Sequence, residues 1–114
     1  EALNKITHKK IHKEIEKRIS ESENKLIIID APLLHKISTI SKCDEVVLIT
    51  ASFDELANRI VERDNISFDT AKARLESQLI DYKINSTLII ENNKDKNSFI
   101  NTAMKLGKEW LKWQ

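Results

Sequence analysis

Arginine is the residue type whose number and spacing best fit a specific chemistry in this chain. There are four arginines against fifteen lysines, and Arg59, Arg63 and Arg74 fall within sixteen residues. A planar guanidinium presents parallel N–H donors that match two phosphate oxygens, a fixed geometry that an ammonium group lacks. The cluster therefore predicts contact with an anionic ligand. Exposed ion pairs would explain it equally well, and the nearby acidic partners are Glu55, Glu62, Asp64 and Asp69.

Three other side chains could take part in chemistry. Asp30 ends an apolar run, where a carboxylate could hold a metal-bound water or orient a hydroxyl; the alternative is that it satisfies backbone donors in the turn before Pro32. His8 and His12 have a spacing that zinc can use, but no third ligand accompanies them, so we expect no metal there. Cys43 has no histidine close in sequence, which favours a packed thiol over a nucleophile.

Composition excludes several classes of function. The chain of 114 residues has one glycine, Gly107, whereas a phosphate-binding P-loop or a dinucleotide fingerprint needs two or three. The net charge of +1 does not favour nucleic acid as a partner, and the apolar runs are too short to span a membrane. We therefore expect a cytoplasmic protein. Because the first residue is Glu1 and helical spacing begins at once, we expect the chain to be part of a longer protein.

The alternation of apolar runs with helical spacing predicts an α/β fold. Short β-branched runs predict parallel strands at about residues 25–30, 45–50 and 87–91. Helical spacing predicts helices over about 5–23 and 96–113. A sheet of three strands is thin, so further strands are expected.

The stretch from about 53 to 82 predicts two helices joined by a corner. Residues 64–66 break the pattern, and Ser67 is a good N-cap for the second helix. Ligands of such folds gather at the carboxyl ends of the strands, which here are polar. These ends lie at residues 30–32, 50–52 and 91–93.

The ordered set of segments resembles the dephospho-CoA kinase family, a branch of the P-loop enzymes related to nucleoside monophosphate kinases. The matching stretches lie at 3–11, 28–34, 43–47, 59–65, 71–78 and 89–93. The resemblance implies a P-loop NTPase-type three-layer fold. It also implies that residues 1–24 end the helical acceptor region, that 25–58 and 83–114 form the α/β core, and that 59–82 form a lid.

The resemblance also implies roles for individual residues. Arg63 and Asp30 would be catalytic. The residues that would bind the nucleotide are Arg59, Arg63, Arg74, Gln78, Asn92 and Asn93, of which the asparagines lie beside the adenine. The acceptor side would be lined by His8, Pro32 and Leu33. The sequence departs from the family pattern at Lys9, His35, Lys36 and Leu56.

The expected function is that of the whole protein: ATP-dependent phosphorylation of the 3′-hydroxyl of dephospho-CoA in coenzyme A biosynthesis. ATP and Mg2+ would be bound mainly through the missing N-terminal segment, which supplies the P-loop. The chain alone is therefore expected to be inactive. Two alternatives remain: a non-catalytic α/β binding module, and a related kinase for another small hydroxyl acceptor.

Overall fold

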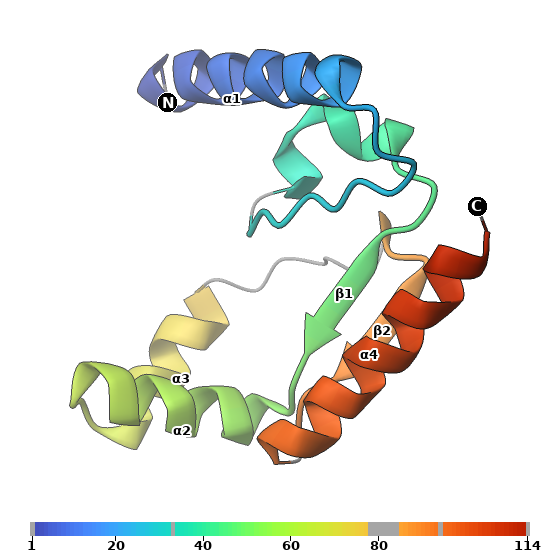
Figure 1. Cartoon of the computed structure of the whole chain (residues 1–114). Coiled ribbons are helices and arrows are strands. Elements are labelled where there is room, and N and C mark those ends of the chain that lie inside the picture. Colours follow the sequence, from blue (N-terminus) through green and yellow to red (C-terminus); the bar gives the residue numbers. More distant parts are fainter. Residues whose placement is uncertain (1, 33, 78–84, 94, 114) are drawn as a thin grey trace. The chain divides into compact units, whose positions relative to one another are not determined.

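The computed structural model describes residues 2–32, 34–77, 85–93 and 95–113. The chain divides into two compact units, whose elements are labelled in Figure 1. The first unit comprises Glu1–Val46 and Thr102–Gln114, and the second comprises Val47–Asn101. The last helix, α4 (Lys96–Lys112), therefore contributes residues to both units.

The first unit is helical throughout its regular elements. Helix α1 (Ala2–Glu21) is followed by the short 3-10 helices η1 (Leu34–Lys36) and η2 (Ser38–Lys42), and η2 contacts α1. These elements confirm the helix predicted over 5–23. In the same unit Trp110 of α4 donates its indole N–H to the carboxylate of Glu45. None of the helices within the described ranges has the length and apolarity needed to cross a membrane.

The prediction of a strand at 25–30 is wrong. Residues 26–30 form no strand, and the side chains of Ile27 and Ile28 are 42% and 70% exposed. A strand needs a neighbouring backbone to accept and donate its hydrogen bonds, and an apolar β-branched run cannot supply that neighbour itself. In the described part of the chain the only sheet has two strands, so the run at 26–29 stays unpaired.

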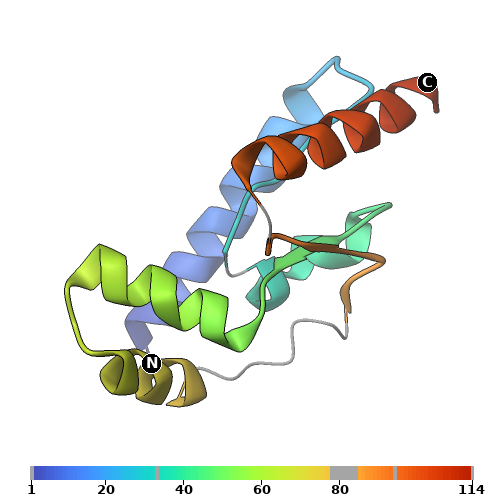
Figure 2. The ribbon, with the colours of Figure 1, turned by 90° about the horizontal axis from the view of Figure 1, so that it is seen from below.

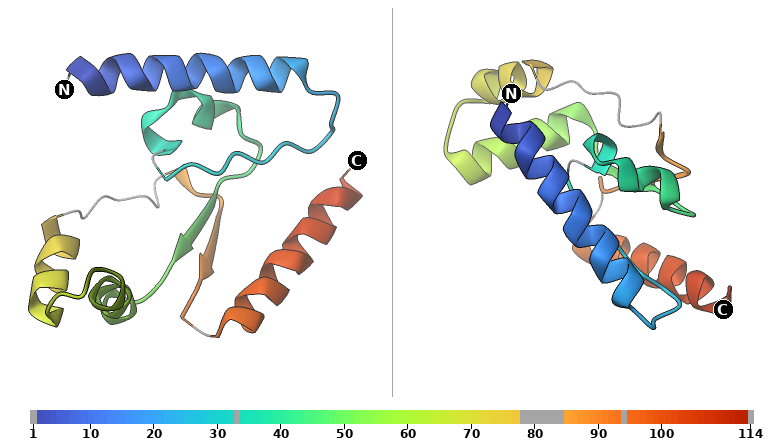
Figure 3. Two further views of the ribbon diagram at one scale, coloured as in Figure 1. Left: turned by 60° about the vertical axis from the view of Figure 1, so that its left-hand side comes forward. Right: turned by 90° about the horizontal axis from the view of Figure 1, so that it is seen from above.

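The second unit contains that sheet, formed by β1 (Val47–Thr50) and β2 (Leu88–Glu91). The two strands run parallel, as Figure 3 shows. In their register Val47 lies opposite Leu88 and Thr50 opposite Glu91. This confirms the strands predicted at 45–50 and 87–91. Ile49 is 56% exposed and Ile89 is 45% exposed. Because Ile49 pairs with Ile90 rather than Ile89, the two exposed side chains lie on opposite faces of the sheet.

Helices α2 (Phe53–Asp64) and α3 (Phe68–Ser77) pack against each other after β1, as Figure 2 shows. Ala57 of α2 and Ala71 of α3 are both fully buried. Small side chains at these positions let two helix backbones approach closely without loss of packing density. The predicted pair of helices is therefore confirmed.

The corner between α2 and α3 has a local cause. Asn65 ends α2 in the left-handed conformation, with φ 52° and ψ 50°, which asparagine tolerates better than most residues. Ser67 then caps α3, because its Oγ accepts the backbone N–H of Thr70 at 3.2 Å. Both the break and the cap agree with the sequence prediction.

Candidate functional site

The loops that follow β1 and β2 are tied together by polar contacts at the carboxyl edge of the sheet. The backbone N–H of Asn92 donates to the Thr50 carbonyl at 2.7 Å, which extends the parallel ladder by one bond. Asn93 then uses both ends of its amide. Its Oδ1 accepts from the Ser52 backbone N–H at 2.7 Å, and its Nδ2 donates to Glu91 at 3.3 Å.

Arg59 adds a side-chain contact to the same edge. Its Nη2 donates to the Asn92 carbonyl at 2.5 Å, and its Nε donates to Glu55 Oε1 at 3.0 Å. The guanidinium thus bridges α2 and the residue that follows β2. We call Ser52, Glu55, Arg59, Asn92 and Asn93 the sheet-edge cluster.

A second polar group lies at the junction of α2 and α3, where two arginines share one carboxylate. Arg63 binds Asp64 through Nε at 2.7 Å and Nη2 at 3.1 Å, and Arg74 reaches the same carboxylate through Nη1 at 2.8 Å. We call Arg63, Asp64 and Arg74 the arginine corner. The alternative interpretation of the arginines, that they form exposed ion pairs with nearby acidic residues, is therefore partly right. Arg59 pairs with Glu55, and Arg63 and Arg74 pair with Asp64.

The electrostatics of the arginine corner follow from these contacts. The hydrogen bond from Arg63 lowers the pKa of Asp64 below its ordinary value, and the positive charges of Arg63 and Arg74 lower it further. The same hydrogen bond raises the pKa of Arg63. Two cations thus face one anion. The side chains of Arg63 and Arg74 are 73% and 50% exposed, so a dissolved phosphate group can reach both guanidinium groups.

The predicted acceptor-side residues lie in the first unit. His8 is half-buried on α1, while Asp30 and Pro32 are exposed in the irregular segment before η1. Within the described ranges no hydrogen bond or ion pair links His8 to Asp30. Leu33 and Gln78, which the resemblance places in the site, lie outside the described residues.

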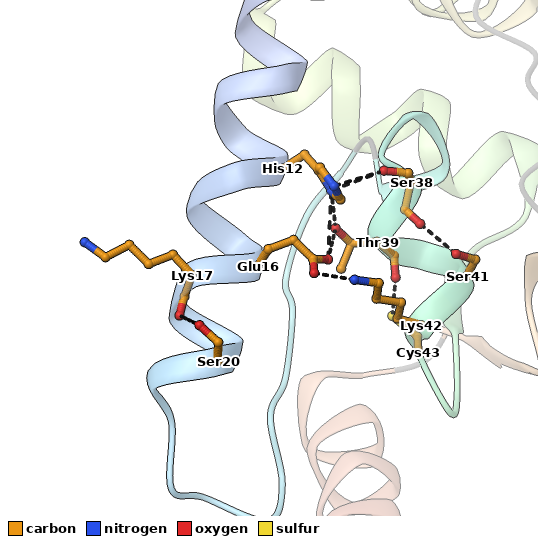
Figure 4. Close-up of polar contacts among 9 residues, drawn as sticks. All are labelled: His12, Glu16, Lys17, Ser20, Ser38, Thr39, Ser41, Lys42 and Cys43. Atoms are coloured by element: carbon orange, nitrogen blue, oxygen red, sulfur yellow. Dashed lines mark hydrogen bonds and ion pairs between the residues drawn. The ribbon is translucent and has the colours of Figure 1, made fainter.

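The first unit also holds a polar network that the sequence did not indicate (Figure 4). Thr39 of η2 is fully buried, and its Oγ1 lies 2.7 Å from His12 Nδ1 and 3.3 Å from Glu16 Oε1. Glu16 also pairs with Lys42, and this hydrogen bond is the main reason that the pKa of Glu16 lies below its ordinary value. Ser38 completes the group through His12. We call these five residues the Thr39 network.

Cys43 follows this network and is a packed thiol. Its Sγ donates to the Thr39 carbonyl at 3.7 Å. Burial, followed by the charge of Asp44, raises the pKa of the thiol. A raised pKa keeps the group protonated near neutral pH, which is the opposite of what a nucleophile needs.

The family is decided by comparison with known proteins. The model of the dephospho-CoA kinase family matches residues 1–97 of this chain. The chain belongs to the dephospho-CoA kinase family. That match includes α1, both strands and the arginine corner, and it confirms the resemblance seen in the sequence.

Curated members of the dephospho-CoA kinase family are similar over most of the chain. A dephospho-CoA kinase of Carboxydothermus hydrogenoformans is 30% identical over 98% of this chain and 56% of its own length. One from Fusobacterium nucleatum is 32% identical over 82% of this chain and 49% of its own length. One from Staphylococcus saprophyticus is 39% identical over 68% and 38%, respectively. The chain thus spans about half the length of the relatives named first.

No solved structure matches the chain.

Ser52 and Glu55 are the members of the sheet-edge cluster that the sequence analysis did not single out as site residues. Two signals could have found them. The spacing Ser-x-x-Glu at 52–55 is that of a helix capping box, and Glu55 precedes Arg59 by four residues, the spacing of a helical ion pair.

Proposed function

We propose that the whole protein transfers the γ-phosphoryl group of ATP to the 3′-hydroxyl of dephospho-CoA, in the cytoplasm. The observation that carries this proposal is the family match over residues 1–97, which includes the arginine corner. Phosphoryl transfer depends mainly on positioning and on neutralising the charge of the phosphate oxygens. Paired, exposed guanidinium groups suit the second task.

Arg63 and Arg74 are the proposed contacts to the nucleotide phosphates, with Arg63 at the reacting group. Each guanidinium is held by Asp64 and exposed to solvent. A triphosphate can therefore take the place of Asp64 on these guanidinium groups, because no buried ion pair has to be broken. Arg59 and Gln78 are proposed as supporting residues, and 59–82 as the lid that brings the arginines to ATP.

Asn92 and Asn93 are proposed to lie beside the adenine. Their support is their place at the carboxyl edge of a parallel sheet, where ligands of α/β proteins bind. Asn92 bonds to Thr50 and Asn93 bonds to Ser52, which holds this loop against the end of β1 and the start of α2.

The acceptor side is assigned by resemblance. We propose that His8, Pro32 and Leu33 contact dephospho-CoA and that Asp30 orients the acceptor hydroxyl. The exposure of Asp30 leaves its carboxylate accessible to a substrate. In this proposal residues 1–24 end the acceptor region, while 25–58 and 83–114 belong to the core.

The remaining machinery is proposed to lie in the rest of the whole protein. The chain contains one glycine, so its residues include no P-loop, and we propose that it is inactive by itself. Within the described ranges no three acidic, histidine or cysteine side chains gather into a candidate magnesium site. We propose that ATP and Mg2+ are bound mainly through the rest of the whole protein. A three-layer P-loop fold of the whole protein completes the proposal.

The test is a phosphorylation assay on the full-length protein with ATP, Mg2+ and dephospho-CoA. The expected product is coenzyme A, with one ADP formed for each molecule. Other hydroxyl acceptors, such as nucleosides and pantetheine derivatives, are assayed in parallel. Phosphorylation of one of these instead would identify a different small-molecule kinase. Failure to phosphorylate any acceptor would leave the binding module as the better description.

A further inference from the structure

The N-terminus of α2 has the sequence of a capping box but only half of its contacts. In such a box the N-cap serine accepts the backbone N–H three residues on, and the glutamate there reaches back to the backbone N–H of the serine. The first contact is present, because Ser52 Oγ accepts from the Glu55 N–H at 3.3 Å. The second is replaced, because the Ser52 N–H donates to Asn93 Oδ1 at 2.7 Å.

This replacement leaves the carboxylate of Glu55 available to another partner. Glu55 Oε1 instead accepts from Arg59 Nε at 3.0 Å and lies 2.9 Å from Arg59 Nη2. That same Nη2 donates to the Asn92 carbonyl at 2.5 Å. The first two turns of α2 therefore hold the Asn92–Asn93 loop at two points, from residues 33 and 41 positions away in sequence.

Glu55 orients Arg59 for its contact with the Asn92 carbonyl. The side chain of Arg59 is 40% exposed and would otherwise be free to sample several rotamers in water. Its bond to Glu55 directs Nη2 toward the Asn92 carbonyl. Arg63 follows Arg59 by one turn on the same face of α2, so the helix that holds the loop also carries the arginine corner.

We propose that Glu55 is a positioning residue for nucleotide binding, because it holds Arg59 on the Asn92 carbonyl and so helps to fix the Asn92–Asn93 loop to the start of α2. This inference rests on the proposed function in one respect: it takes the loop and the arginine corner to be the two contacts of the nucleotide. Glu55 acts through Arg59, while the backbone N–H of Ser52 holds Asn93. The side chain of Glu55 does not itself touch ATP.

The experiment measures ATP and dephospho-CoA binding to the full-length protein by calorimetry, together with the KM of each substrate. The variants are Glu55→Ala, Glu55→Gln, Arg59→Ala and the double variant of Glu55→Ala with Arg59→Ala. Glu62→Ala is the matched control, since Glu62 is exposed on the same helix. Thermal unfolding of every variant is recorded.

The expected result is a split between the two substrates. Glu55→Ala weakens ATP binding about fivefold and raises the KM for ATP by a similar factor, the most that an exposed ion pair usually contributes. The dephospho-CoA values and kcat stay within twofold. Glu55→Gln, which keeps an acceptor for Arg59, recovers part of the loss. The double variant binds ATP no more weakly than Arg59→Ala alone.

Three results would overturn the inference: unchanged ATP binding in Glu55→Ala, equal weakening of both substrates, or additive losses in the double variant. The proposed function fails separately. A wild-type protein that binds ATP but does not phosphorylate dephospho-CoA would contradict the function, while the ATP-binding cycle would still decide the role of Glu55. A wild-type protein that does not bind ATP would contradict both.

Discussion

The Thr39 network and the arginine corner are both built around an oxygen shared by several partners, but they differ in exposure. Thr39 is fully buried and bonds to His12 and Glu16. At the corner, Arg63 is 73% exposed and Arg74 is 50% exposed around Asp64. A buried polar group costs free energy as soon as it loses a partner, whereas an exposed ion pair can exchange partners with water at little cost.

This difference assigns different tasks to the two groups. The Thr39 network joins η2 to α1 and should contribute to the free energy of unfolding. The arginine corner can release its carboxylate and take a ligand, so it should contribute to activity. Each of the following tests uses the full-length protein and asks whether stability and activity separate in this way.

The largest effect is expected from removing both arginines of the corner. The double variant of Arg63→Ala with Arg74→Ala should lower kcat roughly a hundredfold or more, because the transferred phosphoryl group loses its cationic contacts. Steady-state kinetics with ATP and dephospho-CoA measure this. Thermal unfolding should stay close to that of the wild type.

Arg18→Ala is the matched control for this test. Arg18 forms an exposed ion pair with Glu14 on α1, so the variant removes an arginine and an ion pair without touching the corner. Its kcat should equal that of the wild type. A corner variant with a normal kcat would contradict the assignment of Arg63 and Arg74.

The next effect is expected in stability alone. Thr39→Val keeps the shape of the side chain but removes the hydroxyl that His12 and Glu16 share. The free energy of unfolding should fall by about 1–3 kcal/mol, the cost of leaving buried polar atoms without a partner. Urea denaturation measures the change, and Thr39→Ser should lose less. If Thr39→Val unfolds like the wild type, the network is not a source of stability.

A smaller effect is expected at Asn65, which shapes the corner without carrying charge. Asn65→Ala should lower the free energy of unfolding by about 1 kcal/mol, because alanine pays more than asparagine for the left-handed conformation. Asn65→Gly should be nearly neutral by comparison. Denaturation of both variants gives the difference. Equal stability of the alanine and glycine variants would mean that the backbone relaxes out of this conformation.

The smallest effect is expected from acid. The pKa of Glu16 lies below its ordinary value of 4.5 and that of Asp64 below its ordinary value of 3.8. A lowered pKa in the folded state stabilises the protein above the ordinary value, and this contribution is lost as the pH falls through the folded pKa. Stability should therefore decline slightly below about pH 4.5. Denaturation at several pH values should show a flatter decline for Glu16→Gln and for Asp64→Asn; an unchanged decline would contradict these contributions.

Local patterns predicted most of the regular elements. Helical spacing placed α2 and α3, and the residues Asn65 and Ser67 marked the corner because capping depends on neighbours within a few positions. The β-branched runs placed β1 and β2 for a similar reason. The same kind of run at 26–29 misled the prediction. Its side chains favour a strand, but strand formation depends on a partner that lies elsewhere in the chain.

The sequence by itself determined the helices, the corner, two strands and the family, because each depends on spacing along the chain. Only the tertiary structure decided which partner each polar group uses. Glu55 binds Arg59 rather than the Ser52 backbone because Asn93, 41 positions away, already accepts that N–H. Such exchanges depend on distances across the fold, which spacing along a chain does not specify.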